Sequence, residues 1–98
     1  MSDPYDEEPE GWPCVASPRV TDLLSDPLLP AEVFSAIVAL TVAINETRGE
    51  LPGSTASETW PQQRRIPLGA DGSLGLAEYV IAADADPPQI VLTRIQLY

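Results

Sequence analysis

The clearest pattern in the sequence is a helical repeat of apolar residues over positions 31–48. The repeat consists of Val33, Ile37, Leu40 and Ile44. Their three- and four-residue spacing places the side chains on one face of a helix. Pro30 before the segment and Gly49 after it are typical of a helix start and a helix end. Phe34 and Val38 widen the apolar face, so we expect most of this helix to be buried.

A second, shorter helix is predicted before it. Ser17 is a typical N-cap residue, and Pro18 suits the first helical position. The helix has to end by Asp26, because Pro27 follows. Residues 11–17 could form a short strand, which Pro13 restricts to the edge of a sheet or to its first residues.

The C-terminal third changes from a helical period to extended segments. These segments are rich in β-branched and aromatic residues and are predicted as strands over 65–68, 74–81 and 89–98. A glycine-bounded turn at 69–72 separates the first two, and the last two are expected to pair antiparallel. Residues 50–63 are predicted to be a long loop. Helices followed by strands indicate an α+β domain.

Alternation along strand 89–98 divides its residues between two faces. The face expected to pack on the long helix carries Val91, Thr93, Ile95 and Leu97. The other face carries Ile90, Leu92, Arg94, Gln96 and Tyr98. This second face becomes polar toward the C-terminus, where it offers a guanidinium, an amide and a phenol in a row.

The net charge of the chain limits the kinds of partner that it can bind. The 98 residues hold 15 Asp and Glu against five Arg, for a net charge of −10. This balance argues against direct binding to a nucleic-acid backbone and suits a basic partner. Residues 1–10 hold five of the acids and are expected to form a disordered acidic tail, with one domain over 11–98. The absence of a signal sequence or a long apolar run predicts a soluble, cytoplasmic protein without a membrane segment.

Common catalytic and metal-binding signatures are missing from the sequence. It contains no His, and Cys14 is its only cysteine, so ordinary zinc sites and His-based triads are excluded. The glycines at 69–75 join two strands and do not open a helix, so they do not form a phosphate-binding loop. We therefore predict neither a metal ion nor a cofactor.

The remaining candidates for a binding site are polar residues of the predicted sheet. They are Arg64, Arg65, Glu78, Arg94, Gln96 and Tyr98. Arg94 could bind an anion, or it could pair with Glu78 on the neighbouring strand and keep an open face hydrated. Arg64 and Arg65 add positive charge just before the turn, or form an ordinary solvated junction.

The order of these elements resembles the RelE/ParE toxin superfamily over residues 18–98. Two motifs carry the resemblance: R-I-P-L-G at 65–69 and V-L-T-R-I at 91–95. The resemblance implies two helices packed on one face of a small antiparallel sheet, and a cognate antitoxin as the protein partner. Members of this bacterial family either cleave messenger RNA on the ribosome or poison DNA gyrase. The messenger-cleaving members use arginines of the central sheet and a tyrosine near the C-terminus, so the resemblance makes Arg94 and Tyr98 the candidate catalytic residues if the protein is an enzyme. Strand 74–81 departs from the pattern of the nucleases, because it holds Glu78 and no basic residue.

Three functions stay open at this point. The leading hypothesis is a RelE/ParE-like toxin-family protein that acts through protein–protein contacts. An alternative is a non-toxic acidic binding module, such as an immunity-like protein, an inhibitor or a nucleic-acid mimic. The third is a ribosome-dependent messenger-RNA endonuclease, which the scarcity of positive charge disfavours.

Overall fold

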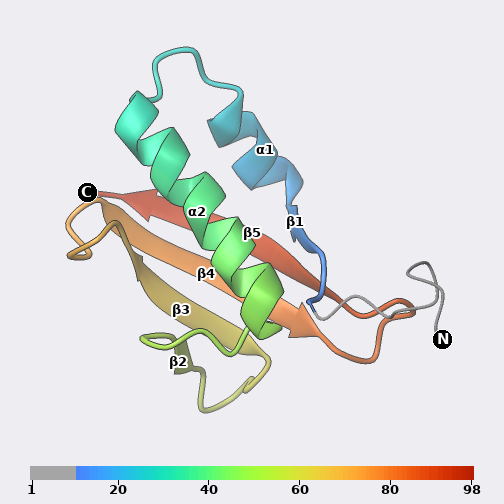
Figure 1. Ribbon diagram of the computed structural model, residues 1–98. Coiled ribbons are helices and arrows are strands. Elements are labelled where there is room, and N and C mark those ends of the chain that lie inside the picture. The colour runs from blue at the N-terminus through green and yellow to red at the C-terminus, as the bar shows by residue number, and fades with distance from the viewer. Residues whose placement is uncertain (1–10) are drawn as a thin grey trace, which may run out of the picture.

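A computed structural model describes residues 11–98 (Figure 1). The acidic segment 1–10, expected to be a disordered tail, lies outside the described residues. The elements in chain order are β1 (Cys14–Ala16), α1 (Pro18–Leu24), α2 (Ala31–Thr47), β2 (Thr55–Ala56), β3 (Gln63–Leu68), β4 (Gly75–Ala82) and β5 (Gln89–Leu97). The predicted α+β class is confirmed, with two helices and one five-stranded sheet.

The sheet is mixed, and the expectation of a purely antiparallel sheet was wrong. Its strand order is β1-β5-β4-β3-β2, and every neighbouring pair is antiparallel except β1 and β5. The parallel pair is held by hydrogen bonds from Ile90 N to Pro13 O at 2.8 Å and from Ser17 N to Leu92 O at 3.0 Å. The sequence of a three-residue strand does not indicate whether the strand pairs parallel or antiparallel. The direction of β1 is set by the position of α1, which begins directly after it.

Both helices lie on the same face of the sheet (Figure 1). The predicted start of α1 is confirmed: Ser17 caps it, and its Oγ accepts a hydrogen bond from Val20 N at 3.3 Å. Helix α2 ends one residue earlier than predicted, because Arg48 adopts a left-handed conformation with φ of 54° and Gly49 continues the turn with φ of 84°.

The core lies between α2 and the helix-facing side of the sheet. All four residues of the apolar repeat in α2 are buried, as predicted. The sheet contributes mainly Ile66, Leu68, Ala77, Tyr79, Ile90 and Leu92. Burial of Ile90 and Leu92 contradicts the predicted faces of the last strand, which placed Val91 and Thr93 toward the helix.

A β-bulge explains this error. Glu78 is paired with Arg94, but its neighbour Tyr79 is paired with Leu92, so Thr93 has no residue opposite. The extra residue inverts the alternation: Leu92 before it and Ile95 after it both face the helices. Thr93 fixes the bulge by donating a hydrogen bond from its Oγ1 to Glu78 O at 3.2 Å. A strict two-residue period cannot detect such an insertion.

Helix α2 is the longest helix in the part of the chain that the structure describes. Neither it nor α1 combines the length and the apolar character needed to cross a bilayer.

Candidate partner-binding face of the sheet

The side of the sheet that faces away from the helices is left uncovered by every element between residues 11 and 98 (Figure 1). Strand register and alternation identify the side chains that three neighbouring strands place there. They are Gln63, Arg65 and Pro67 from β3, Leu76, Glu78 and Val80 from β4, and Val91, Arg94 and Gln96 from β5. We call this surface the open face.

A row of three charged residues crosses the middle of the open face. Glu78 lies on the central strand, paired in register with Arg65 on one side and with Arg94 on the other. Its carboxylate Oε1 lies 3.1 Å from Arg65 Nε. The Glu78 side chain is only 13% exposed, whereas that of Arg65 is 62% exposed. So exposed an ion pair stabilises the fold by about 0–1 kcal/mol, and its main effect is to orient both groups.

Within the charged row, Arg94 is the arginine that has no acceptor among residues 11–98. The register predicted from sequence, Glu78 opposite Arg94, is confirmed, but the carboxylate makes its ion pair with Arg65. Arg94 is exposed, and no acceptor within residues 11–98 bonds to it. Its planar guanidinium can therefore receive a carboxylate or another planar anion of a partner through two parallel hydrogen bonds.

Gln96 and Tyr98 extend this surface toward the C-terminus. Gln96 is exposed and paired in register with Leu76, two positions along β4 from Glu78. Tyr98 follows the last residue of β5 and is 80% exposed, with its backbone N–H bonded to Leu74 O at 3.2 Å. Both residues lie at the end of the open face, where a partner could reach the amide and the phenol.

Arg64 was predicted to lie with the other polar residues of the sheet, but it is not on the open face. Its register partner is Tyr79, a core residue, so alternation turns Arg64 toward the helix side of the sheet. There Nη1 donates a hydrogen bond to Ser54 Oγ at 3.1 Å, while its buried Nε has no acceptor within residues 11–98. Arg64 thus fastens the loop after α2 and is not part of the open face.

The open face offers recognition and little acid–base chemistry. It combines two guanidinium groups, one carboxylate and two amides, and the sequence contains no histidine to exchange a proton near neutral pH. Within residues 11–98, no three His, Cys, Asp or Glu side chains come together as a metal site requires. Apolar neighbours such as Leu76, Val80 and Val91 surround the charged row. This mixture of charge and apolar surface suits contact with another protein.

Cys14 lies on β1 and is half-buried. Burial raises the pKa of its thiol from 9.0 to about 11. Only the thiolate is a nucleophile, so Cys14 is a weak one at neutral pH. The protonated form is favoured in the folded state, and this contribution to stability is complete below pH 9 and is lost as the pH rises through 11.

We expect alkylation of Cys14 to be roughly 100-fold slower in the folded protein than in the unfolded chain at pH 8, since two pH units separate the two pKa values. Iodoacetamide labelling followed by mass spectrometry measures this ratio. The labelling is done without urea and in about 8 M urea, which unfolds the protein. Because Cys14 is the only cysteine, every labelled molecule reports on it. Equal rates in the two conditions would contradict the burial of the thiol.

One surface was missed by the sequence analysis altogether. Phe34 and Val38 were expected to widen the buried face of α2, but they are 45% and 44% exposed, and Val42 on the same helix is 52% exposed. The signal was present in the sequence, because α2 carries no charged residue between Glu32 and Glu46 and its apolar residues extend beyond the face that packs on the sheet.

Comparisons with known proteins give no relative for this chain: no family model, no curated protein and no solved structure matches it.

Proposed function

We propose that this chain is a RelE/ParE-like member of a bacterial toxin–antitoxin pair that acts through protein–protein contacts, with a cognate antitoxin as its partner. The observation that carries the proposal is the open face, where Arg94 is held beside the Arg65–Glu78 ion pair with no acceptor of its own among residues 11–98. A side chain of this kind can bond to a partner without first giving up a bond to another residue among 11–98.

The arrangement of the chain supports the same proposal. Two helices followed by consecutive antiparallel strands is the element order on which the sequence resemblance rests. The open face is a surface of about three strands, large enough for a folded partner or an extended segment to lie across it. The antitoxin is the partner that the resemblance implies.

The charges of the open face disfavour the RNA-cleaving alternative. Phosphate cleavage needs several aligned cationic groups around the charge that develops in the transition state. Here Glu78 neutralises Arg65, Arg64 faces the other side, and Arg94 is the remaining cation of the row. We therefore propose binding without RNA cleavage.

Net charge favours one second candidate. A charge of −10 on 98 residues suits a non-toxic acidic module that covers a basic surface of another protein, as an inhibitor or an immunity-like protein does. In that case the chain protects the cell, and its own expression has no effect on growth.

Induced expression in a bacterial host separates these functions. We expect growth arrest, relief of the arrest when the product of the neighbouring gene is co-expressed, and intact messenger RNA on ribosomes throughout. Arg94→Ala should weaken the arrest or the relief at least several-fold, because the unpaired guanidinium is lost. Arg19→Ala, which removes an exposed arginine from α1, is the matched control and should behave as the parent protein.

Two results would overturn the proposal. Normal growth under strong expression favours the acidic binding module. Cleavage of ribosome-bound messenger RNA that Arg94→Ala abolishes makes Arg94 a catalytic residue, with Tyr98 as the next to test.

A further inference from the structure

The residues of the open face are complementary to one another across two neighbouring strands. Each β4 residue on this surface is paired in register with a β5 residue on the same surface. The three pairs are Glu78 with Arg94, Val80 with Val91, and Leu76 with Gln96. The members of the first pair have opposite charge, and those of the second are both apolar. A surface with this pattern can bind a second copy of itself.

Two-fold symmetry brings these pairs together between two copies. In a symmetric dimer, residue i of one copy contacts residue j of the other, and the reverse contact also forms. Two sheets can pack face to face with their strands aligned. If the axis runs along the strands between β4 and β5, each β4 residue lies opposite its own register partner from the other copy. Glu78 of each copy then faces Arg94 of the other, and Val80 faces Val91.

This position of the axis supplies the acceptor that Arg94 lacks among residues 11–98. A carboxylate has two oxygens with about four acceptor positions, so Glu78 can bind a second arginine while its Oε1 keeps the 3.1 Å contact with Arg65. An axis along β4 would instead place the two Glu78 carboxylates opposite each other. An axis between β3 and β4 would match Glu78 with Arg65 and leave Arg94 without a carboxylate. The charges therefore favour the axis between β4 and β5.

The distribution of charge allows two acidic chains to meet at this face. Residues 11–98 hold ten of the acids (15 − 5), and Glu78 is the one on the open face. Arg65 and Arg94 lie there as well, so the face has a net charge of +1 (2 − 1), whereas the whole chain has −10. Repulsion between two copies comes mainly from carboxylates elsewhere, and salt screens it over about 8 Å at physiological ionic strength.

The size of the open face indicates a weak dimer. Three strands about 4.8 Å apart and about 20 Å long offer roughly 300 Å² of flat area in each copy. Stable complexes bury about 800 Å² of accessible surface in each partner. We therefore expect the two copies to separate on dilution. A protein partner that covers more of the surface can displace the second copy.

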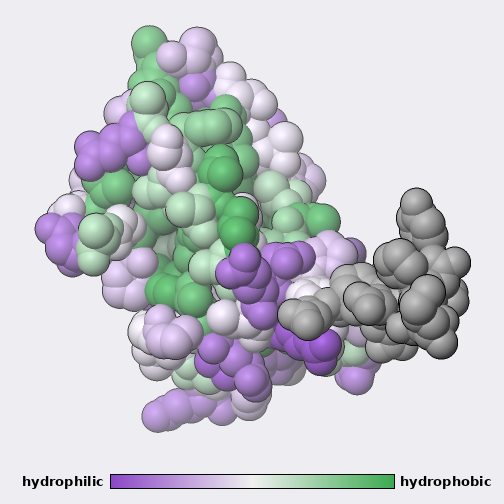
Figure 2. All heavy atoms as spheres, in the orientation of Figure 1, coloured by the Kyte–Doolittle hydropathy of each residue, from purple (hydrophilic) through white to green (hydrophobic). Residues whose placement is uncertain are grey.

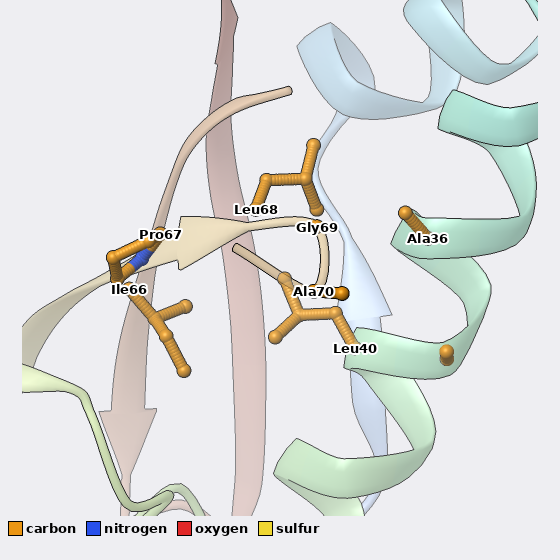
Figure 3. Close-up of a pocket in the computed structure, with 8 residues that line it drawn as sticks. Ala36, Leu40, Ile66, Pro67, Leu68, Gly69 and Ala70 are labelled. Atoms are coloured by element: carbon orange, nitrogen blue, oxygen red, sulfur yellow. The ribbon is translucent and has the colours of Figure 1, made fainter. Parts of the chain in front are cut away.

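The helix side of the molecule shows no comparable complementarity among the described residues. In Figure 2, seen from that side, hydrophobic atoms run along α2. Beside the helix, a groove of about 300 Å³ separates Ala36, Ala39 and Leu40 from residues 66–70 at the end of β3 (Figure 3). The residues that line it have no polar side chains, so the lining does not distinguish one occupant from another. On the open face, by contrast, the charges specify how the occupant is arranged.

We infer that the free protein forms a two-fold symmetric dimer in which the open faces of two copies pack together and Glu78 of each copy binds Arg94 of the other. The dimer covers Arg94, so a partner that uses this side chain has to separate the copies first. The inference concerns the chain on its own and does not depend on the proposed function. A monomer that arrests growth contradicts the dimer alone, whereas a dimer without effect on growth contradicts the proposed function alone.

Sedimentation equilibrium of the full-length protein, at concentrations up to about 1 mM in about 0.15 M salt, tests the inference. We expect an equilibrium between monomer and dimer. Arg94→Glu places two carboxylates opposite each other at both symmetric contacts and should raise the dissociation constant about tenfold or more. Arg19→Glu is the matched control, because it makes the same change in net charge, from −10 to −12 (−10 − 2), at an exposed position of α1. It should dimerise as the parent protein does.

Glu78→Arg separates the specific contact from general repulsion. It changes the net charge from −10 to −8 (−10 + 2), which by itself favours association. It also places two arginines opposite each other at both contacts, so we expect a weaker dimer. An equal mixture of Arg94→Glu and Glu78→Arg should form a heterodimer, because one copy supplies carboxylates at both contacts and the other supplies guanidinium groups. Native mass spectrometry identifies the heterodimer by its mass.

Circular dichroism spectra establish that each variant is folded, and Arg94→Glu with its control decides the outcome alone if Glu78→Arg does not fold. A monomer at every concentration overturns the inference. So does a dimer that Arg94→Glu leaves intact, or one that Arg19→Glu weakens equally. The absence of a heterodimer from a mixture of the two folded variants overturns it as well.

Discussion

Replacing Ile37 by alanine is expected to lower the free energy of unfolding by about 2–5 kcal/mol. Ile37 lies in the middle of α2 and has no exposed surface. Truncation removes three carbon atoms from the contact between this helix and the sheet and leaves a cavity that the surrounding strands can close only in part. Small domains are stable by about 5–15 kcal/mol, so this change removes a large share of the total.

Urea denaturation monitored by circular dichroism measures the loss. Val38→Ala is the natural comparison, because Val38 is the next residue of the same helix but is 44% exposed. Its truncation should cost less than about 1 kcal/mol, since roughly half of the side chain already contacts water. A loss below about 0.5 kcal/mol for Ile37→Ala would be inconsistent with the packing described for α2.

Replacing Tyr79 by alanine is the second change with a large expected effect, about 3–5 kcal/mol from lost packing alone. Tyr79 is the largest fully buried side chain of the described residues. Its hydroxyl donates a hydrogen bond of 2.6 Å to Gly49 O. Gly49 follows the end of α2, so Tyr79 connects the central strand to the turn that directs the chain away from the helix.

Tyr79→Phe separates the hydrogen bond from the packing. It keeps the ring and leaves Gly49 O without its donor, which should cost about 1–3 kcal/mol. The difference between the two variants then reports the packing of the ring. If Tyr79→Phe proves as stable as the parent protein, the hydroxyl does not anchor the turn, and the role assigned to this bond is wrong.

The helices could be predicted because their signals are local. The spacing of four apolar residues placed α2 to within one residue of its end, and Ser17 with Pro18 placed the start of α1. Each signal lies within a few positions of the structure that it specifies. Long-range pairing plays no part in them.

The sheet was harder to predict than the helices, because its strand pairing depends on interactions between distant segments of the chain. One unpaired residue, Thr93, exchanged the two faces of β5 and moved Val91 out of the core. Whether Arg64 or Arg65 joins the open face depends on strand parity, which is fixed by pairing with β4. The sequence brought Arg65, Glu78 and Arg94 into one candidate group, but it could not decide which arginine the carboxylate binds.

The exposed apolar residues of α2, Phe34, Val38 and Val42, were visible in the sequence, but the first two were wrongly predicted to be buried. Phe34 and Val38 were counted as part of the buried face, since apolar residues on a helix usually are. Helix α2 has only one sheet to pack against, however, and α1 lies beside it without covering these residues. The hydrophobic pattern identifies apolar surfaces, whereas the tertiary fold determines which of these surfaces are buried.

The pairing of β1 with β5 has a consequence for how the chain folds. Ser17 and Thr93, which are joined by a hydrogen bond, stand 76 positions apart. Contacts between such distant segments are slow to form, because the closure of a long loop must be completed before any contact compensates its entropy. During synthesis on the ribosome, β1 and the helices are made before β5. During that interval the sheet lacks the strand that joins β1 to β4, and the apolar side of α2 stays open to chaperones or to premature association.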